Sequence, residues 1–250
     1  MLTKHQIKLF KSLSNKKYRN FEKKIIIEGH RLIQEAILAK AKYDGIWYTE
    51  EYFQKNTQFI TELKNSEIKC QKTSYKSLSQ ICDSQNNQGI IALHALPNRS
   101  EYKVSNSPAL LLDNISDPGN MGSILRTADW FGIKNVICSP KCVDPYNSKV
   151  IRSGMGAHFY LDQIIQTSLS QLIPQLKNEG FNIIGAEIDG TAINKFSLPP
   201  KWGLVLGNEA HGISSNLKSL LDKSVTIPKS GNIESLNVAV ASGVILSSFV

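Results

Sequence analysis

The chain has 250 residues, 41% of them hydrophobic, and 29 basic against 21 acidic residues give it a formal net charge of +8. This length and apolar content predict a globular protein of one large or two modest domains, and no apolar run reaches the roughly 18 residues of a membrane span. The first residues lack the apolar centre of a signal peptide and the four cysteines show no paired spacing, so we expect a cytoplasmic protein with reduced thiols, no membrane and no metal.

The first predicted element is a helix over residues 3–14, where apolar side chains recur at helical spacing in an otherwise polar segment. Residues 1–24 hold eight Lys and Arg residues and one Glu, so nearly all of the net positive charge lies in this basic arm. Such a cluster is either a solvated helix face or the electrostatic footprint of a protein that neutralises phosphates. Both interpretations stay open at this point.

Residues 1–96 predict a small α/β domain. A β-branched run at 25–27 precedes a helix that is apolar on one side, and the segments "DGIWYT", "SEIKCQ" and "GIIALHAL" are typical of further strands between helical stretches. The polar, proline-bounded stretch that follows predicts a linker over residues 97–107.

Strand and helix alternate again over residues 108–250. Five segments are apolar without strict polar alternation, as parallel strands covered on both faces are: "ALLLDNI", "NVICS", "FNIIGAEI", "GLVLG" and "SVTIP". Helices between them are predicted by "SLSQLIPQLKNEG", which closes at Gly180, and by "SSNLKSLL". The last helix, "LNVAVASGVILSSFV", is apolar nearly all round, so we expect it to be buried in a core or against a partner subunit.

Three loops at the ends of these strands carry polar side chains, and parallel α/β sheets bind ligands at such strand ends. In "NISDPGNMGSILRTADWFG" we expect a positive φ at Gly119, Asn120 as the helix N-cap, and Arg126 off the buried stripe, where it can hold an anion or a ribose. "LGNEAHGIS" places Glu209 directly after a strand, and "IPKSGNIESLN" ends in Ser235 and Asn237. The predicted stripe is Met121, Ile124, Leu125 and Ala128.

Each loop taken singly also has an ordinary structural explanation. Asp-Pro-Gly-Asn is a common turn, a helical Arg usually faces water, Glu209 fits a surface carboxylate and Ser235 fits a cap. Three such loops at strand ends nevertheless favour a site. "GMGAHF" lacks the third glycine of a dinucleotide fingerprint, which disfavours the alternative of a nicotinamide-dependent oxidoreductase, and "GAEIDGT" lacks the lysine of a P-loop.

The same loops resemble the motifs of the SpoU-type (TrmH-like) RNA ribose 2′-O-methyltransferases of the SPOUT superfamily. "DPGNMGSILRTADWFG", "LVLGNEAHGIS" and "IPKSGNIESLNVAVASGVIL" match that family's three motifs in order and spacing. "CVDPYNSKVIRSGMGAHF" resembles its intervening segment, and "KKYRNFEKKIIIEGHRLIQEAI" resembles the N-terminal substrate-binding domain of members that modify ribosomal RNA. The resemblance covers essentially the whole chain.

The resemblance implies an α/β fold in which a C-terminal parallel-sheet SPOUT domain, residues 108–250, contains a deep trefoil knot and follows a small RNA-substrate-binding domain. It implies a homodimer whose active site lies near the subunit interface. It also implies S-adenosyl-L-methionine as the cofactor, bound largely through backbone groups. The residues implied for that cofactor are Leu206, Gly207, Asn208, Ile227, Ser235, Leu236 and Asn237.

Methyl transfer requires a ribose 2′-hydroxyl that is aligned with the methyl donor and relieved of its proton. By resemblance Arg126 is the central catalytic residue, with Asn120, Glu209, Ser235 and Asn237 around it. Because a guanidinium is effectively always protonated, we expect Arg126 to grip the neighbouring phosphate and to steady the developing alkoxide charge, not to act as a base.

RNA is the expected substrate, and its 2′-hydroxyl distinguishes it from DNA. Lys16, Lys17 and Arg19 of the basic arm, together with Arg152, are the predicted RNA contacts, and the arm should make the affinity salt-sensitive. The sizeable N-terminal domain favours ribosomal RNA. The alternatives are a tRNA substrate, or a non-catalytic RNA-binding or ribosome-assembly protein with the same fold.

Overall fold

The computed structural model describes residues 2–66, 68–82, 87–97, 102–103 and 105–250. It divides into two compact units: unit 1 comprises residues 1–98 and 146–159, and unit 2 comprises residues 99–145 and 160–250. Residues 98–101 and 104 of the predicted linker lie outside the described residues. No helix in the described ranges is long and apolar enough to cross a membrane.

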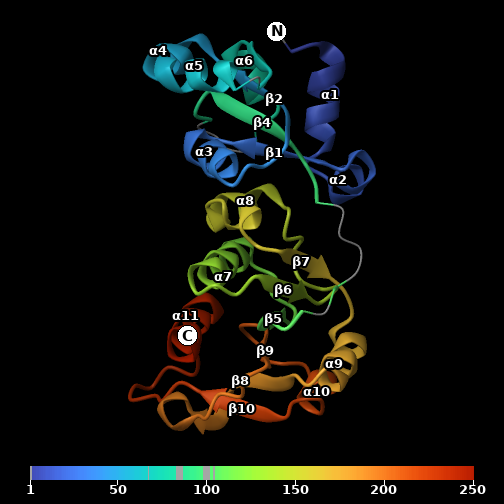
Figure 1. Cartoon of the computed structure of the whole chain (residues 1–250), viewed down its shortest axis with the longest axis vertical. Helices are drawn as coiled ribbons and strands as arrows, with labels where there is room; N and C mark the ends of the chain where they lie inside the picture. Colours follow the sequence, from blue (N-terminus) through green and yellow to red (C-terminus); the bar gives the residue numbers. More distant parts are fainter. Residues whose placement is uncertain (1, 67, 83–86, 98–101, 104) are drawn as a thin grey trace. The chain divides into compact units, whose positions relative to one another are not determined.

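Unit 1 is built on a four-stranded sheet with the order β1-β4-β2-β3 (Figure 1). The strands are β1 (Lys24–Glu28), β2 (Tyr43–Tyr48), β3 (Cys70–Lys72) and β4 (Ile90–Ala95). β4 runs antiparallel to β1 and β2, whereas β3 runs parallel to β2. The predicted alternation of strands and helices is therefore confirmed for this part of the chain.

Helices cover both faces of this sheet. Side chains alternate along β4, so that Ile90 and Ala92 join a core cluster with α3 and α5, while Ile91 and Leu93 join a second cluster with α1. The helical segments of unit 1 are α1 (Lys4–Ser12), α2 (Lys16–Glu22), α3 (His30–Leu38), α4 (Glu50–Lys55), α5 (Thr57–Asn65), α6 (Tyr75–Ser79), α8 (Ser148–Gly154) and the 3-10 turn η1 (Ala157–Phe159).

The basic arm is folded onto unit 1. A capping box of Thr3 and Gln6 starts α1, and Phe10 and Leu13 are 2% and 3% exposed in the second cluster. The ring of Phe10 contacts Trp47 edge-on, with 4.9 Å between centroids. Removing residues 1–24 would therefore uncover part of the core, so the arm is better probed by single substitutions at its exposed positions.

Unit 2 contains a six-stranded, fully parallel sheet with the order β10-β8-β9-β5-β6-β7. Its strands are β5 (Ala109–Leu112), β6 (Asn135–Cys138), β7 (Gln163–Gln166), β8 (Asn182–Ala192), β9 (Trp202–Leu206) and β10 (Lys223–Thr226). The five predicted strands are confirmed. β7 escapes the sequence pattern because its "QIIQ" has only two apolar residues between glutamines.

The helices of unit 2 lie on the two faces of this sheet (Figure 1). α7 (Pro118–Trp130) packs with α11 (Val238–Phe249) on one face, whereas α9 (Leu169–Asn178) and α10 (Ser215–Lys218) join the core cluster of the other. A short 3-10 turn, η2 (Ile193–Lys195), follows β8. Gly180 ends α9 with a φ of 83°, as predicted, because a left-handed residue satisfies the last helical carbonyls.

Two of the four thiols support the loop after β5. Cys138 and Cys142 are buried, and Cys142 Sγ accepts the backbone N–H of Ile115 at 3.3 Å. A hydrogen bond with Cys138 lowers the pKa of Cys142 to about 7. Among the residues that the structure describes, no group of three or more His, Cys, Asp and Glu side chains could hold a metal ion.

We expect the stability of unit 1 to fall when the pH is lowered from about 7 to about 5, because burial lowers the pKa of His94 in β4 below its usual value of 6.5, an effect only partly opposed by the Lys42 carbonyl and Asp44. Below that value the unfolded chain binds a proton that the folded chain resists. Urea unfolding at both pH values tests this. The free energy of unfolding of His94→Gln should depend less on pH, whereas that of His5→Gln, an exposed position on α1, should depend on pH as the wild type does. The same pH dependence in all three proteins would show that His94 is not responsible.

Candidate functional site

The ends of two neighbouring strands bring two of the polar loops together. β5 and β9 pair in parallel from Ala109 opposite Gly203 to Leu112 opposite Leu206. Loop 113–117 follows β5 and loop 207–214 follows β9, so both leave the same edge of the sheet. The third loop, 227–237, leads from β10 into α11, which packs against α7. All three loops therefore approach the start of α7.

The start of α7 differs from its prediction. Its N-cap is Asp117, whose carboxylate accepts the backbone N–H of Asn120 at 2.7 Å, and Pro118 follows at the first helical position. The predicted cap at Asn120 is wrong, and Gly119 has no positive φ. A Cβ on Gly119 would lie 2.9 Å from Asp117 Oδ1, so the glycine leaves room for the capping carboxylate. The amide of Asn120 is thereby left for contacts with other loops.

Two asparagines lock the first two loops together. Asn114 adopts a left-handed φ of 58°, and its carbonyl accepts a hydrogen bond from Asn208 Nδ2 at 2.9 Å. Asn208 Oδ1 accepts the N–H of Ala210 at 2.9 Å and so closes the turn of its own loop. The buried carboxylate of Asp113 accepts the N–H of Ser214 at 2.8 Å. Loops 113–117 and 207–214 thus form one hydrogen-bonded layer.

A chain of three side chains crosses this layer. Asn237 Nδ2 donates to Asn120 Oδ1 at 2.8 Å, and Asn120 Nδ2 donates to Glu209 Oε1 at 2.7 Å. The carboxylate can only accept, so it fixes the orientation of the Asn120 amide. Asn237 Oδ1 caps α11 by accepting the N–H of Ala239 at 2.9 Å, which turns its own NH2 group toward Asn120. Predicted residues from the start of α7, from loop 207–214 and from the third loop therefore meet in a directed polar chain.

Arg126 lies on the outer side of α7. It is exposed, as are Ser123 and Trp130 at helical spacing on either side of it, whereas the predicted stripe is buried. The position of Arg126 off the stripe is therefore confirmed. Among the described residues no carboxylate pairs with its guanidinium, and no hydrogen bond joins it to Asn120, Glu209 or Asn237. Its charge is left for a group from outside the chain.

The residues implied for the cofactor are held by different elements. Leu206 is buried at the end of β9, and its carbonyl accepts the N–H of Asp113 at 2.8 Å. Ile227 is half-buried after β10, whereas Ser235 and Leu236 are exposed in the third loop. Within the described part of the chain no hydrogen bond joins residues 227–236 to loop 207–214. Asn237 connects the third loop to Asn120 of α7 and, through Asn120, to Glu209 of loop 207–214.

The predicted RNA contacts lie in different environments. Lys16 and Lys17 are exposed on α2. Arg19 is 4% exposed and donates to the carbonyls of Leu13 at 2.8 Å and Ser14 at 2.6 Å, so its interpretation as an RNA contact is corrected to a structural role. The guanidinium of Arg152 lies 3.9 Å from the carboxylate of Glu28 in the same unit.

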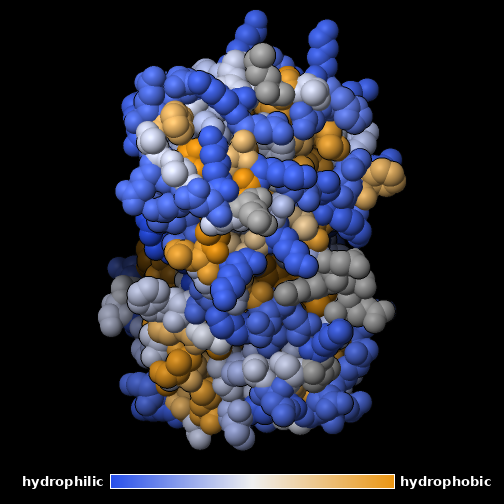
Figure 2. Space-filling view, turned by 45° about the horizontal axis from the view of Figure 1, so that its top comes forward, coloured by the Kyte–Doolittle hydropathy of each residue, from blue (hydrophilic) through white to orange (hydrophobic). Residues whose placement is uncertain are grey.

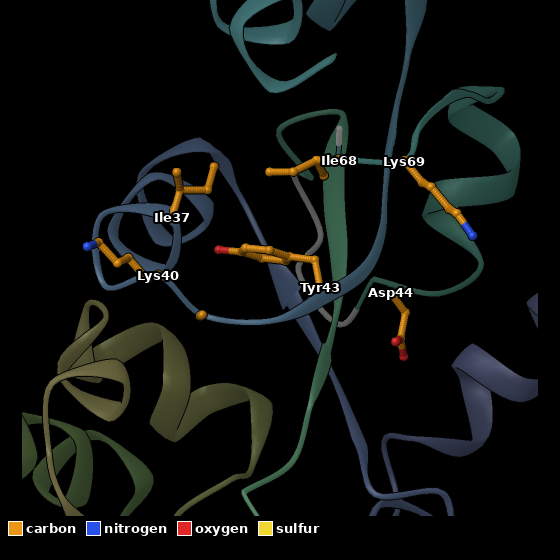
Figure 3. Close-up of a pocket in the computed structure, with 7 residues that line it drawn as sticks. Ile37, Lys40, Tyr43, Asp44, Ile68 and Lys69 are labelled. Atoms are coloured by element: carbon orange, nitrogen blue, oxygen red, sulfur yellow. The ribbon is translucent and has the colours of Figure 1, made fainter. Parts of the chain in front are cut away.

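A cavity of about 440 Å³ opens in unit 1 and contains none of these loop residues. Figure 3 shows the ring of Tyr43 in its middle, with Ile37 and Lys40 to one side and Lys69 to the other. The Tyr43 hydroxyl donates to the Ile33 carbonyl at 3.2 Å, so the ring is fixed as part of the wall. The cavity holds no residue of the polar chain and is not the candidate site.

Sequence reasoning missed the residues that hold the site together. Asp113, Asn114 and Ser139 make the bonds under the loops, and Ser139 Oγ accepts the N–H of Asn114 at 2.9 Å. The available signal was a polar residue placed directly after an apolar strand, as Asp113 follows β5 and Ser139 follows β6. A buried polar side chain at such a place needs partners, and here the partners are the loops themselves.

Comparison with known proteins supplies the family. Residues 107–247 match the SpoU rRNA Methylase family, and residues 4–92 match the MRM3-like substrate binding domain. The chain is 30% identical over 242 residues to the 23S rRNA (guanosine(2553)-2′-O)-methyltransferase RlmP of Bacillus subtilis, covering 96% of this chain and 94% of that protein.

Two solved structures share the whole fold. A candidate RNA methyltransferase of the TrmH family from Porphyromonas gingivalis is 30% identical, with a TM-score of 0.85 over 100% of this chain and 98% of that one. A protein described as an RNA 2′-O ribose methyltransferase is 25% identical, with a TM-score of 0.82 over 99% of this chain and 95% of that one. The motifs, the parallel sheet and these matches agree: this chain belongs to the SpoU rRNA methylase family.

Proposed function

We propose that this protein transfers a methyl group from S-adenosylmethionine to a ribose 2′-hydroxyl of ribosomal RNA. The observation that carries the proposal is the chain of hydrogen bonds from Asn237 through Asn120 to Glu209, at the edge of a parallel sheet and on the helix that bears Arg126. Membership in the family supports the reaction, and the name of the Bacillus subtilis relative supports ribosomal RNA over tRNA.

The three loops fit the cofactor in their chemistry. When bound, S-adenosylmethionine supplies a methyl group on a positively charged sulfur. Glu209 offers a carboxylate that suits such a charge, and Ile227 and Leu236 offer apolar surface that suits a purine ring. We therefore assign the cofactor to the loops after β9 and β10, together with the start of α11.

The side chains of the polar chain position the substrate. Glu209 Oε1 is occupied by Asn120, while no described residue donates to Oε2, which leaves that oxygen to accept a substrate hydroxyl. A guanidinium is a cation that donates but does not accept hydrogen bonds, so Arg126 binds a phosphate beside the reacting ribose and stabilises the negative charge that develops on the ribose oxygen. Most of the rate acceleration then comes from alignment.

We expect Asn120→Ala to lower kcat roughly 10- to 100-fold, because the truncation removes both bonds of the polar chain and leaves Glu209 unoriented. The KM for S-adenosylmethionine should change less than kcat, and steady-state methyl transfer measures both. Ser123→Ala, one turn further along α7 and exposed, is the matched control. An unchanged kcat for Asn120→Ala would remove the polar chain from the mechanism.

The substrate-binding unit is proposed to hold RNA with its exposed lysines. Lys4, Lys8, Lys11, Lys17 and Lys23 are exposed around α1 and α2. Each phosphate that such a lysine neutralises releases counterions, so affinity should fall steeply with salt. Arg19 is left out of this group because it is buried.

A homodimer and the trefoil knot are also part of the proposal. Trp130 on α7 is 82% exposed, and Val240 and Val244 on α11 are 53% and 37% exposed, although these helices pack together. Figure 2 shows hydrophobic residues gathered at its lower left, on the side where Figure 1 draws α11. A second copy would cover this surface, and sedimentation of Val240→Glu against the wild type tests it.

The reaction is tested by transfer of labelled methyl groups from S-adenosylmethionine to unmodified ribosomal RNA and tRNA transcripts, followed by mapping of alkali-resistant 2′-O-methyl sites. Incorporation into ribosomal RNA is expected. Incorporation into tRNA alone would show that the substrate is tRNA and not ribosomal RNA. A protein that binds S-adenosylhomocysteine in a thermal-shift assay but methylates neither free transcripts nor ribosomal particles would be the non-catalytic RNA-binding alternative.

A further inference from the structure

The short helix α2 presents two aromatic side chains to solvent. Phe21 is 80% exposed and Tyr18 is 47% exposed. They stand three residues apart on the helix, so their rings are neighbours on its surface. Among the described residues neither ring stacks on another aromatic side chain. Stacking on other described aromatic rings therefore does not explain why these two positions are aromatic.

The helix that carries these rings is held firmly. Asn15 caps it by accepting the N–H of Lys17 at 2.9 Å, and the buried guanidinium of Arg19 ties it to the turn after α1. Its C-cap is Lys23, which adopts a left-handed φ of 53° and whose carbonyl accepts the N–H of Leu96 at 2.7 Å. The position of the two rings is thus set before any ligand binds, which lowers the entropic cost of binding.

The surroundings of the rings are positively charged. Lys16, Lys17 and Lys23 are exposed on and beside α2, and Glu22 is the single acidic residue among residues 1–24. Flat aromatic surface beside lysines matches a ligand that alternates flat rings with phosphates. Unpaired RNA has this chemistry, since aromatic side chains stack on its bases and lysines neutralise its backbone.

We propose that Tyr18 and Phe21 form a stacking platform for unpaired bases of the RNA, with the neighbouring lysines on its phosphates. The inference rests on the proposed RNA substrate and adds a site at which the substrate-binding unit grips it. Stacking needs a π face and not merely an apolar side chain, so the platform should discriminate phenylalanine from leucine.

The test is direct binding of a fluorescent single-stranded oligouridylate by the full-length chain, measured by anisotropy at fixed salt. Phe21→Ala and Phe21→Leu should each weaken binding about 5- to 150-fold, the range for loss of one stacked base, while Phe21→Trp should retain it. Because Phe21 is exposed, the melting temperatures of all three variants should match the wild type. Tyr75→Ala is the matched control, since Tyr75 is 53% exposed on α6 of the same unit.

A second variant separates stacking from charge. Lys17→Ala should reduce the slope of log affinity against log salt by about 0.7, the value for one phosphate contact on a single strand, whereas Phe21→Ala should leave that slope unchanged. Affinity for S-adenosylhomocysteine should be unaffected in both variants, because neither residue belongs to unit 2.

Three outcomes would overturn the platform. Full RNA affinity in Phe21→Leu would show that apolar contact, not stacking, holds the RNA. Full RNA affinity in Phe21→Ala would show that the rings do not bind RNA and would favour a protein partner for this surface. Failure of the wild-type chain to bind the single-stranded oligouridylate would also contradict the stacking platform. None of these depends on methyl transfer, so a chain that methylates RNA but fails here would lose the platform and keep the proposed function.

Discussion

Replacing Arg126 with alanine is expected to reduce methyl transfer by ~10²- to 10³-fold, the usual cost of removing one group that stabilises developing charge. Arg126 is exposed and has no ion pair among the described residues, so its loss should cost the fold almost nothing. Single-turnover methyl transfer to ribosomal RNA measures the effect. The melting temperature and the affinity for S-adenosylhomocysteine should both stay at their wild-type values.

The variant Arg126→Lys decides how the guanidinium acts. Lysine keeps the charge but loses the planar pair of donors that grips a phosphate. An activity of Arg126→Lys between those of Arg126→Ala and the wild type would support bidentate binding of a phosphate by the guanidinium. Nearly full turnover with lysine would show that a positive charge alone is sufficient, and our account of the Arg126 role would be wrong.

Sequence patterning predicts most strands of unit 2 because the central ones are buried on both faces. β5, β6 and β9 are buried along their whole length and β8 contains a buried run, residues 183–185, whereas β7 is flanked by glutamines whose amides are used in tertiary bonds. Gln163 Nε2 donates to Asn135 Oδ1 at 2.9 Å. A strand whose ends carry such polar contacts cannot be recognised from hydropathy.

The candidate site could be predicted as a set of residues but not as a geometry. Asn120, Glu209 and Asn237 stand out as polar residues at strand and helix ends. Their separation along the chain, however, does not predict which of these side chains form hydrogen bonds with one another. Asn120 also shows how a local rule misleads. Asp117 and Asn120, three positions apart, are both of residue types that favour helix caps, and Pro118 selects Asp117 as the cap because proline prefers the first helical position.

Charge counting fails for a related reason. Arg19 contributes to the basic arm in the sequence, but its guanidinium is buried against two backbone carbonyls. Burial depends on the turn between α1 and α2, which no count of lysines and arginines contains. The assignment of residues 146–159 to unit 1 is likewise invisible in the order of the motifs, since it follows from packing of Ile151 into the core of that unit.

The second large effect is expected at Gly207, directly after β9. A Cβ at this position would lie 2.2 Å from the backbone carbon of Gly212 and 2.3 Å from the nitrogen of Ile213. These are main-chain atoms and cannot rotate away, so Gly207→Ala should force loop 207–214 open at a cost of about 3 kcal/mol or more in the free energy of unfolding. Denaturant unfolding followed by circular dichroism measures it.

Gly231→Ala is the matched control because Gly231 has nothing within 4 Å of its would-be Cβ and lies in the third loop, so its stability should stay within about 0.5 kcal/mol of the wild type. A wild-type stability for Gly207→Ala would contradict the close backbone approach. The affinity of Gly207→Ala for the cofactor, measured at a low temperature at which this variant is still folded, separates a role in the cofactor site from a role in the fold alone. If affinity is lost, the turn shapes the cofactor site; if affinity is kept, Gly207 serves the fold alone, and Glu209 reaches Asn120 without it.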